Sequence, residues 1–125
     1  MDVISVDELR CQVRAFLNDF KELMGQGRYA VKDHHKTLQT LISLGLTSYQ
    51  MDAVIRSIEL EDYESGPNPD ELRPGVFWVF GKSIDGNEIY IKLKIVTYGS
   101  RDEQAICISF HTSEYPLAYP LRSKS

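Results

Sequence analysis

The side chains best suited to chemistry in this chain lie in two runs in which polar and apolar residues alternate. The first run carries Tyr90, Lys92 and Lys94, and the second carries Ser109 and His111. Histidine exchanges a proton near neutral pH, lysine stabilises negative charge, and a tyrosine hydroxyl donates a hydrogen bond. Cleavage of a phosphodiester by the neighbouring ribose 2′-hydroxyl needs such groups: a base, a cation and an acid for the leaving oxygen.

Alternation with a period of two predicts that both runs are half-buried strands. A loop at 97–104 would close them into an antiparallel hairpin, with Tyr90 and His111 as cross-strand neighbours whose Cβ atoms are about 5 Å apart. The predicted pairs are Val96 with Ala105, Leu93 with Ile108, Ile91 with Phe110, and Tyr90 with His111. This register, or one differing by two residues, puts the apolar partners on one face and Cys107 with the polar side chains on the other, whereas a slip of one residue would mix them.

A third strand is predicted from the apolar run at 76–80, which precedes the turn signal Asp85-Gly86. A two-residue turn would place Trp78 in the core beside the next strand. A three-residue turn would instead bring Lys82 opposite Tyr90, where its ammonium group could bind phosphate. Both registers fit the pattern.

Helix signals occupy the first half of the chain. The predicted helices run from Ser5 to Met24, from Asp33 to Gly45, and from Thr47 to Ile58. Residues 28–32 are a candidate edge strand, and the acidic, proline-containing stretch at 59–75 is predicted to be a long surface loop. His34 and His35 are predicted to form an exposed polar turn. Together these elements predict an α+β fold, with N-terminal helices packed on one face of a small, mainly antiparallel sheet.

Composition narrows the class of protein. The 125 residues, 42% of them hydrophobic, suit a single domain, and the two cysteines lack the spacing of a zinc site or a disulfide framework. Without an apolar run of about 18 residues or a basic leader, we expect a cytoplasmic protein that does not enter a membrane. The net charge of −4 argues against a general polyanion binder, but it divides into −5 for residues 1–75 and +1 for residues 76–125. An anion-binding surface is therefore expected in the C-terminal half.

Four segments, taken in order, resemble the MqsR group of toxins from bacterial type II toxin–antitoxin systems, within the RelE-like superfamily. They are Leu44-Gly45-Leu46-Thr47, Glu61-Asp62-Tyr63-Glu64-Ser65-Gly66-Pro67, Ile89-Tyr90-Ile91-Lys92-Leu93 and Ile108-Ser109-Phe110-His111. The resemblance covers residues 28–119 of a single domain at 1–125. Residues 1–27 would be an additional N-terminal helix, and residues 120–125 would be a tail.

The resemblance implies an endoribonuclease, an mRNA interferase, that uses neither metal nor other cofactor. Its implied partners are messenger RNA, a cognate antitoxin with a zinc-binding part and a helix-turn-helix part, and the ribosome if cleavage takes place there. The loop tyrosine of the family falls on Tyr63, its strand tyrosine on Tyr90, and its C-terminal basic residue on His111. Two features depart from the family: Glu64 or Ser65 stands in place of a lysine, and its catalytic glutamine has no counterpart.

The predicted catalytic residues are His111, Tyr90, Lys92 and Lys82, and the predicted RNA-binding residues are Tyr63, Lys94, Arg101 and Tyr115. The tail at 116–120 is expected to close one end of the site. Two other classes of function fit the sequence. One is a non-catalytic module whose acidic first half binds a protein, and the other is a domain that binds RNA without hydrolysing it.

Overall fold

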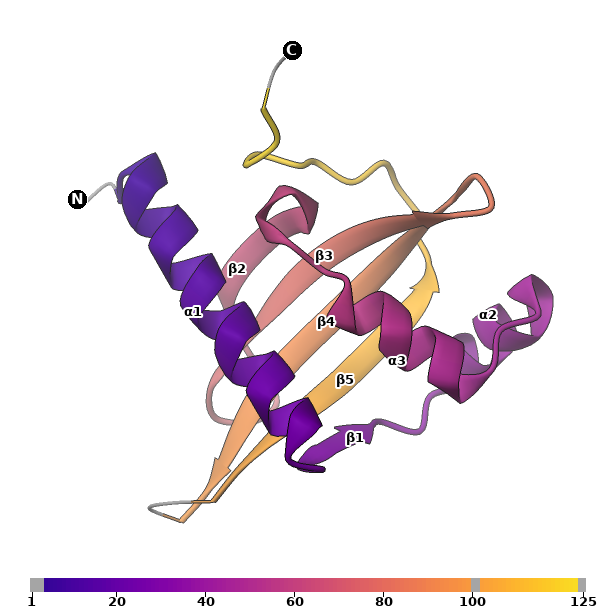
Figure 1. Ribbon diagram of the computed structural model, residues 1–125, viewed down its shortest axis with the longest axis horizontal. Helices are drawn as coiled ribbons and strands as arrows, with labels where there is room; N and C mark the ends of the chain where they lie inside the picture. Colours follow the sequence, from indigo (N-terminus) through magenta and orange to yellow (C-terminus); the bar gives the residue numbers. More distant parts are fainter. Residues whose placement is uncertain (1–3, 100–101, 124–125) are drawn as a thin grey trace.

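The computed structural model describes residues 4–99 and 102–123. The elements are α1 (Val6–Gly25), β1 (Tyr29–Val31), α2 (His35–Leu44), α3 (Ser48–Arg56), the 3-10 helix η1 (Leu60–Asp62), β2 (Tyr63–Pro69), β3 (Val76–Ile84), β4 (Asn87–Tyr98) and β5 (Asp102–Thr112). Within these residues the strands form one sheet in the order β1-β5-β4-β3-β2, with β1 parallel to β5 and the other pairs antiparallel. Helices α1 and α3 lie across one face of this sheet (Figure 1). The predicted α+β fold is confirmed.

Capping residues explain where α1 and α3 begin. The Ser5 side chain accepts a hydrogen bond of 3.1 Å from the Glu8 N–H at the start of α1. Thr47 and Gln50 form a reciprocal capping box at the start of α3. Each contact satisfies a backbone N–H that has no partner within its helix. Both starts were predicted from the sequence.

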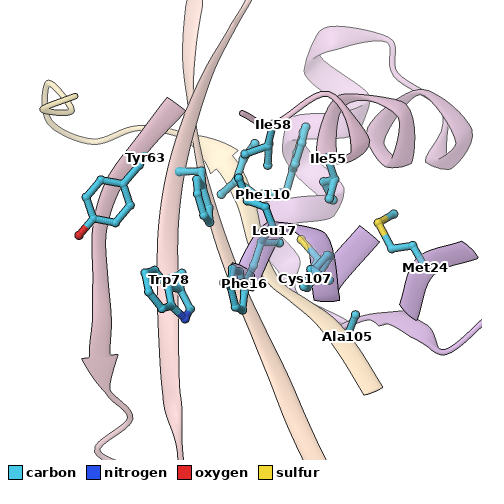
Figure 2. Close-up of a cluster of buried hydrophobic side chains, with 14 of the residues drawn as sticks. Phe16, Leu17, Met24, Ile55, Ile58, Tyr63, Trp78, Ala105, Cys107 and Phe110 are labelled. Carbon is cyan, nitrogen blue, oxygen red and sulfur yellow. The ribbon is translucent and has the colours of Figure 1, made fainter. Parts of the chain in front are cut away.

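The hydrophobic core fills the space between the helices and one face of the sheet (Figure 2). Helix α1 contributes Val13, Phe16, Leu17, Phe20, Leu23 and Met24 to it. The ring of Phe16 stacks on Trp78 of β3 with centroids 5.0 Å apart. Helix α1 therefore shares one core with the sheet, although the resemblance places it outside the family segment.

A two-residue turn joins β3 to β4. Asp85 and Gly86 occupy its central positions with φ of 50° and 81°, as a tight hairpin turn requires. The resulting pairs include Ile84 with Asn87, Trp78 with Leu93, and Gly81 with Tyr90. Of the two predicted registers, this one buries Trp78 and keeps Lys82 away from Tyr90.

A β-bulge in β5 corrects part of the predicted hairpin register. The observed pairs include Tyr90 with His111 and Ile91 with Phe110, as predicted, but Leu93 with Cys107 and Val96 with Gln104. The pairing skips Ile108, so the alternation of β5 changes phase there. Cys107 is consequently fully buried in the core as a free thiol, while Ile106 and Ile108 line the opposite face. The predicted alternation failed because it assumed an unbroken period of two.

The stretch predicted as a long loop is largely ordered as η1 and β2. Strand β2 pairs with β3 along the edge of the sheet, with two irregularities in its register. Proline and glycine are tolerated here because an edge strand needs hydrogen bonds on one side only. A shorter loop at 70–75 connects β2 to β3.

Candidate functional site

One face of the sheet lies opposite the core, and we call it the open face. Tyr90 and Lys92 of β4 project onto it, as do Ser109 and His111 of β5. These side chains are partly exposed, whereas their neighbours Ile91 and Phe110 are fully buried. The two strands thus present the predicted chemical groups on the side that α1 and α3 leave uncovered (Figure 1).

These side chains line a shallow pocket of about 320 Å³, which we call the polar pocket. Its lining residues are His34, Lys36, Tyr90, Lys92, Ser109, His111, Glu114 and Tyr115. Five of the eight, Tyr90, Lys92, Ser109, His111 and Tyr115, were singled out from the sequence. The strands bring them together because cross-strand neighbours on one face stay within side-chain reach.

Tyr90 and His111 form a stacked pair at the centre of the pocket. Their ring centroids are 5.0 Å apart and their planes differ by 16°. The Nδ1 atom of His111 lies 2.9 Å from the backbone oxygen of Thr112, which can only accept a hydrogen bond. Nδ1 therefore carries the hydrogen of the neutral ring, leaving the lone pair of Nε2 to accept a proton.

The hydroxyl of Tyr90 stays protonated at neutral pH. Burial raises its pKa above the ordinary value of 10.0, and the nearby Tyr115 and Glu64 raise that pKa further. The phenol is then a hydrogen-bond donor to any anion in the pocket. Tyr90 and His111 consequently offer a proton donor and a proton acceptor from adjacent strands.

Lys92 is, with Lys36, one of two lysines that line the pocket. Its ammonium nitrogen lies 4.0 Å from the centroid of the Phe77 ring. Among the residues that the structure describes, no carboxylate oxygen comes within 4.0 Å of this nitrogen. The charge of Lys92 is held by an aromatic face instead of a counterion, so a bound phosphate would not have to displace an acidic side chain.

Helix α2 contributes the second wall of the pocket. His34 caps the start of this helix, because its Nδ1 accepts a 3.1 Å hydrogen bond from the Lys36 N–H. The sequence pattern instead predicts Asp33 as the cap. The Thr37 hydroxyl accepts a buried 3.2 Å hydrogen bond from the Phe110 N–H at the edge of β5. These contacts hold the start of α2 against the C-terminal end of β5.

Lys36 and Glu114 form an ion pair of 2.6 Å at the rim of the polar pocket. Lys36 lowers the pKa of the Glu114 carboxyl through this hydrogen bond and through its charge, and His111 adds a smaller effect. Sequence reasoning missed Lys36 and Glu114 and placed His34 in an exposed turn. The parallel pairing of β1 with β5 carries the start of α2 to this site, and local patterns do not report it.

Lys82 does not belong to the polar pocket. It follows Phe80 by two residues, so it points to the helix-covered face of the sheet. Its ammonium nitrogen lies 2.8 Å from a carboxylate oxygen of the buried Asp62 in η1. The structure therefore separates Lys82 from Tyr90 and pairs its charge.

Tyr63 and Lys94 are also structural where they stand. The Tyr63 ring is 5% exposed and packs edge-on against Trp78 (Figure 2), and its hydroxyl donates a 2.6 Å hydrogen bond to the Gly66 carbonyl. Lys94 is 3% exposed, because its ammonium nitrogen lies 2.7 Å from Asp70 and 2.9 Å from the Pro74 carbonyl. Neither side chain is accessible to RNA in this structure.

The other two predicted RNA-binding residues are Tyr115 and Arg101. Tyr115 is 54% exposed at the rim of the polar pocket, in a position to contact a ligand there. Arg101 lies outside the described residues.

The tail after β5 borders the polar pocket at the Tyr115 end. One carboxylate, Glu88, accepts hydrogen bonds from the Leu117 N–H at 2.8 Å and from the Tyr119 hydroxyl at 2.9 Å. Glu64 accepts a third from the Ala118 N–H at 3.1 Å. The tail is thus fastened to β4 and β2. Glu114 and Tyr115, which precede it, line the polar pocket, but residues 116–120 do not, so closure of the site by this segment stays a prediction.

A search against models of protein families, the curated proteins and the solved structures found no match to this chain. In the described part of the chain, no group of three or more His, Cys, Asp or Glu side chains is arranged to hold a metal ion. Of the helices seen there, none has the length and apolar character needed to cross a membrane. The proposed function therefore rests on the geometry of the polar pocket.

Proposed function

We propose that this protein is an endoribonuclease that cleaves single-stranded messenger RNA through attack by the ribose 2′-hydroxyl. The observation that carries the proposal is the stacked Tyr90 and His111 pair with Lys92 in one open pocket. The set combines a proton acceptor, a proton donor and a cation that has no counterion among the described residues. These are the three groups that cleavage without a metal ion requires.

In the proposed reaction His111 Nε2 removes the proton from the 2′-hydroxyl. The 2′-oxygen then bonds to phosphorus, while the bond from phosphorus to the 5′-oxygen of the next nucleotide breaks. Lys92 stabilises the negative charge that builds on the phosphorane oxygens. Tyr90 donates a proton to the departing 5′-oxygen, and the products are a 2′,3′-cyclic phosphate and a 5′-hydroxyl. His111 Nε2 then releases the proton it took to water, and the Tyr90 phenolate regains a proton from water, because the raised pKa of Tyr90 disfavours the phenolate.

Lys36 is the second cation of the site. It lies at the pocket rim, where it forms an ion pair with Glu114. This position differs from that of the lysine in the MqsR group, at which this sequence has Glu64 or Ser65. Lys82 cannot bind phosphate in this pocket, because it lies on the other face and is paired with Asp62. The proposal therefore assigns phosphate binding to Lys92, with support from Lys36.

The biological setting that we propose is a type II toxin–antitoxin system of the MqsR group in the bacterial cytoplasm. Its support is the order of the four resembling segments, together with a pocket suited to ribonuclease chemistry. A cognate antitoxin would hold the enzyme inactive, and the ribosome would be a further partner if cleavage takes place there. Co-expression of the neighbouring gene product should then relieve growth inhibition caused by this chain.

The chemistry is tested with one labelled RNA and its all-deoxy counterpart, each incubated with the purified protein in EDTA, with and without ribosomes. We expect RNA fragments that end in a 2′,3′-cyclic phosphate, and an intact DNA strand, because DNA lacks the attacking hydroxyl. Bound but uncut RNA in both mixtures would contradict the proposal and identify a binding domain instead. Cleavage of both strands would contradict the proposed nucleophile.

A further inference from the structure

The open face continues beyond Lys92 into a second and larger depression of about 690 Å³, which we call the apolar groove. Its apolar lining consists of Ala30, Val31, Leu72, Pro74, Ile95, Val96, Tyr98, Ile106 and Ile108. Lys92 lines both the groove and the polar pocket. A ligand whose phosphate lies at Lys92 can therefore extend into the groove without a break.

The floor of the groove exists because of the β5 bulge. The bulge turns Ile106 and Ile108 onto the open face, and Ala30 of β1 lies beside Ile106 through the parallel pairing. Ala30, whose side chain is a single methyl group, lines the groove at this point. Leu72 of the loop at 70–75 is 92% exposed, although it stands at the groove wall.

Positive charge borders this apolar floor. Lys32 and Arg73 line the groove along with Lys92, and they belong to three different segments of the fold. Asp70 is the one carboxylate in the lining, and it already accepts a hydrogen bond from the buried Lys94 ammonium group. The groove therefore favours a ligand with flat apolar groups on an anionic backbone.

We propose that the apolar groove binds the nucleobases adjacent to the cleaved bond of a single-stranded RNA. This inference rests on the proposed function, because it takes the phosphate over Lys92 to be the scissile one. Unpaired bases bury their faces on the aliphatic floor and against Tyr98, while the next phosphates lie near Lys32 and Arg73. Paired bases are stacked and cannot enter, so the groove selects single strands and contributes to the choice of cleavage site.

The test measures binding of a fluorescent 2′-fluoro RNA hexamer, which lacks the attacking hydroxyl, and of the same hexamer with abasic sites. Ala30→Trp fills the groove floor, and Leu72→Ser removes an exposed wall residue without touching the core. Ile42→Ser is the matched control, because Ile42 is 72% exposed on α2 and does not line the groove. We expect Ala30→Trp to weaken binding of the hexamer about tenfold and Leu72→Ser to weaken it about threefold. Ile42→Ser should bind like the wild type.

The abasic hexamer should bind weakly to the wild type and lose nothing further in Ala30→Trp. The groove assignment is overturned if folded Leu72→Ser and Ala30→Trp bind the intact hexamer as the wild type does. It is also overturned if the wild type does not bind the intact hexamer. Cleavage of a dinucleoside monophosphate separates the two proposals, since it needs the polar pocket but little of the groove. If the wild type cleaves the dinucleoside monophosphate but the groove variants bind the hexamer normally, only the groove inference is contradicted. If the groove variants bind the hexamer more weakly but the wild type cleaves nothing, only the proposed enzymatic activity is contradicted.

Discussion

The two faces of the sheet use alternate residues of the same strands for different purposes. On the core face Phe80, Ile91 and Leu93 are fully buried, and α1 and α3 cover this side of the sheet. On the open face Tyr90 and Lys92, which flank Ile91, are partly exposed and line a pocket. Because strand side chains alternate, one strand can carry both a core and a site. Truncation of the buried core-face side chains should therefore cost stability, whereas truncation of the polar side chains that line the pocket should change function more than stability.

Lys82 and Lys92, which lie on opposite faces, differ in how their charge is held. On the core face the Lys82 ammonium is paired with Asp62 at 2.8 Å. On the open face Lys92 lies over the Phe77 ring. The buried carboxylate of Asp62 has to be paired because leaving it alone would cost free energy, and Lys82 is its partner, whereas the partly exposed Lys92 needs none. This difference is what makes Lys92, and not Lys82, suited to bind an anionic ligand.

The largest stability effect is expected on the core face. Phe80→Ala removes a fully buried ring that packs against Phe16 and Tyr63. We expect the free energy of unfolding to fall by about 3–5 kcal/mol, from lost burial and the cavity left behind. Urea denaturation measures the change, and a loss below about 1 kcal/mol would contradict the assignment of Phe80 to the core.

Gly81→Ala tests the contact between the open face and the tail. A Cβ at this position would overlap the Tyr119 hydroxyl and lie 2.7 Å from Leu117 Cδ1. We expect a loss of about 1–3 kcal/mol in unfolding free energy and faster proteolysis within residues 113–123. Gly25→Ala is the matched control, since a Cβ there meets nothing within 4 Å. Equal behaviour of the two variants would show that the tail does not lie on Gly81.

Asp70→Asn tests the ion pair that holds the loop beside the groove. Lys94 lowers the pKa of Asp70 from its ordinary value of 3.8 to about 2, chiefly through the hydrogen bond it donates. The lowered pKa means that the pair stabilises the fold fully above about pH 5 and loses this effect as pH falls toward 2. The wild type should exceed the variant in unfolding free energy at neutral pH, and the gap should close between about pH 4 and pH 2. A gap that stays constant with pH would exclude this pair as its source.

Lys92→Gln should have the smallest effect on stability. The side chain is partly exposed, and its described electrostatic contact is with the Phe77 ring. We expect a change of less than about 1 kcal/mol in unfolding free energy, together with weaker RNA binding whose salt dependence is reduced. A large loss of stability would break the separation between the two faces.

Sequence patterns predicted the helices, the hairpin strands and the cross-strand pair of Tyr90 with His111, because these depend on local periodicity and capping. They did not predict the bulge at Ile108, which local alternation cannot reveal, so Ile106 and Cys107 were assigned to the wrong faces. Lys94 was expected on an accessible surface, because its burial under the loop at 70–75 depends on a contact with Asp70 far along the chain. Lys36 escaped notice for the same reason, since the parallel pairing of β1 with β5 positions it.

The central claim is that the open face is catalytic, and His111→Ala tests it most directly. Urea denaturation and single-stranded RNA cleavage in EDTA should be measured on one preparation of this variant and of the wild type. We expect the free energy of unfolding to change by less than about 1 kcal/mol, because His111 is partly exposed at the end of β5. The cleavage rate should fall by about 100-fold or more, because the general base is lost. A folded variant that cleaves RNA at the wild-type rate would contradict the account.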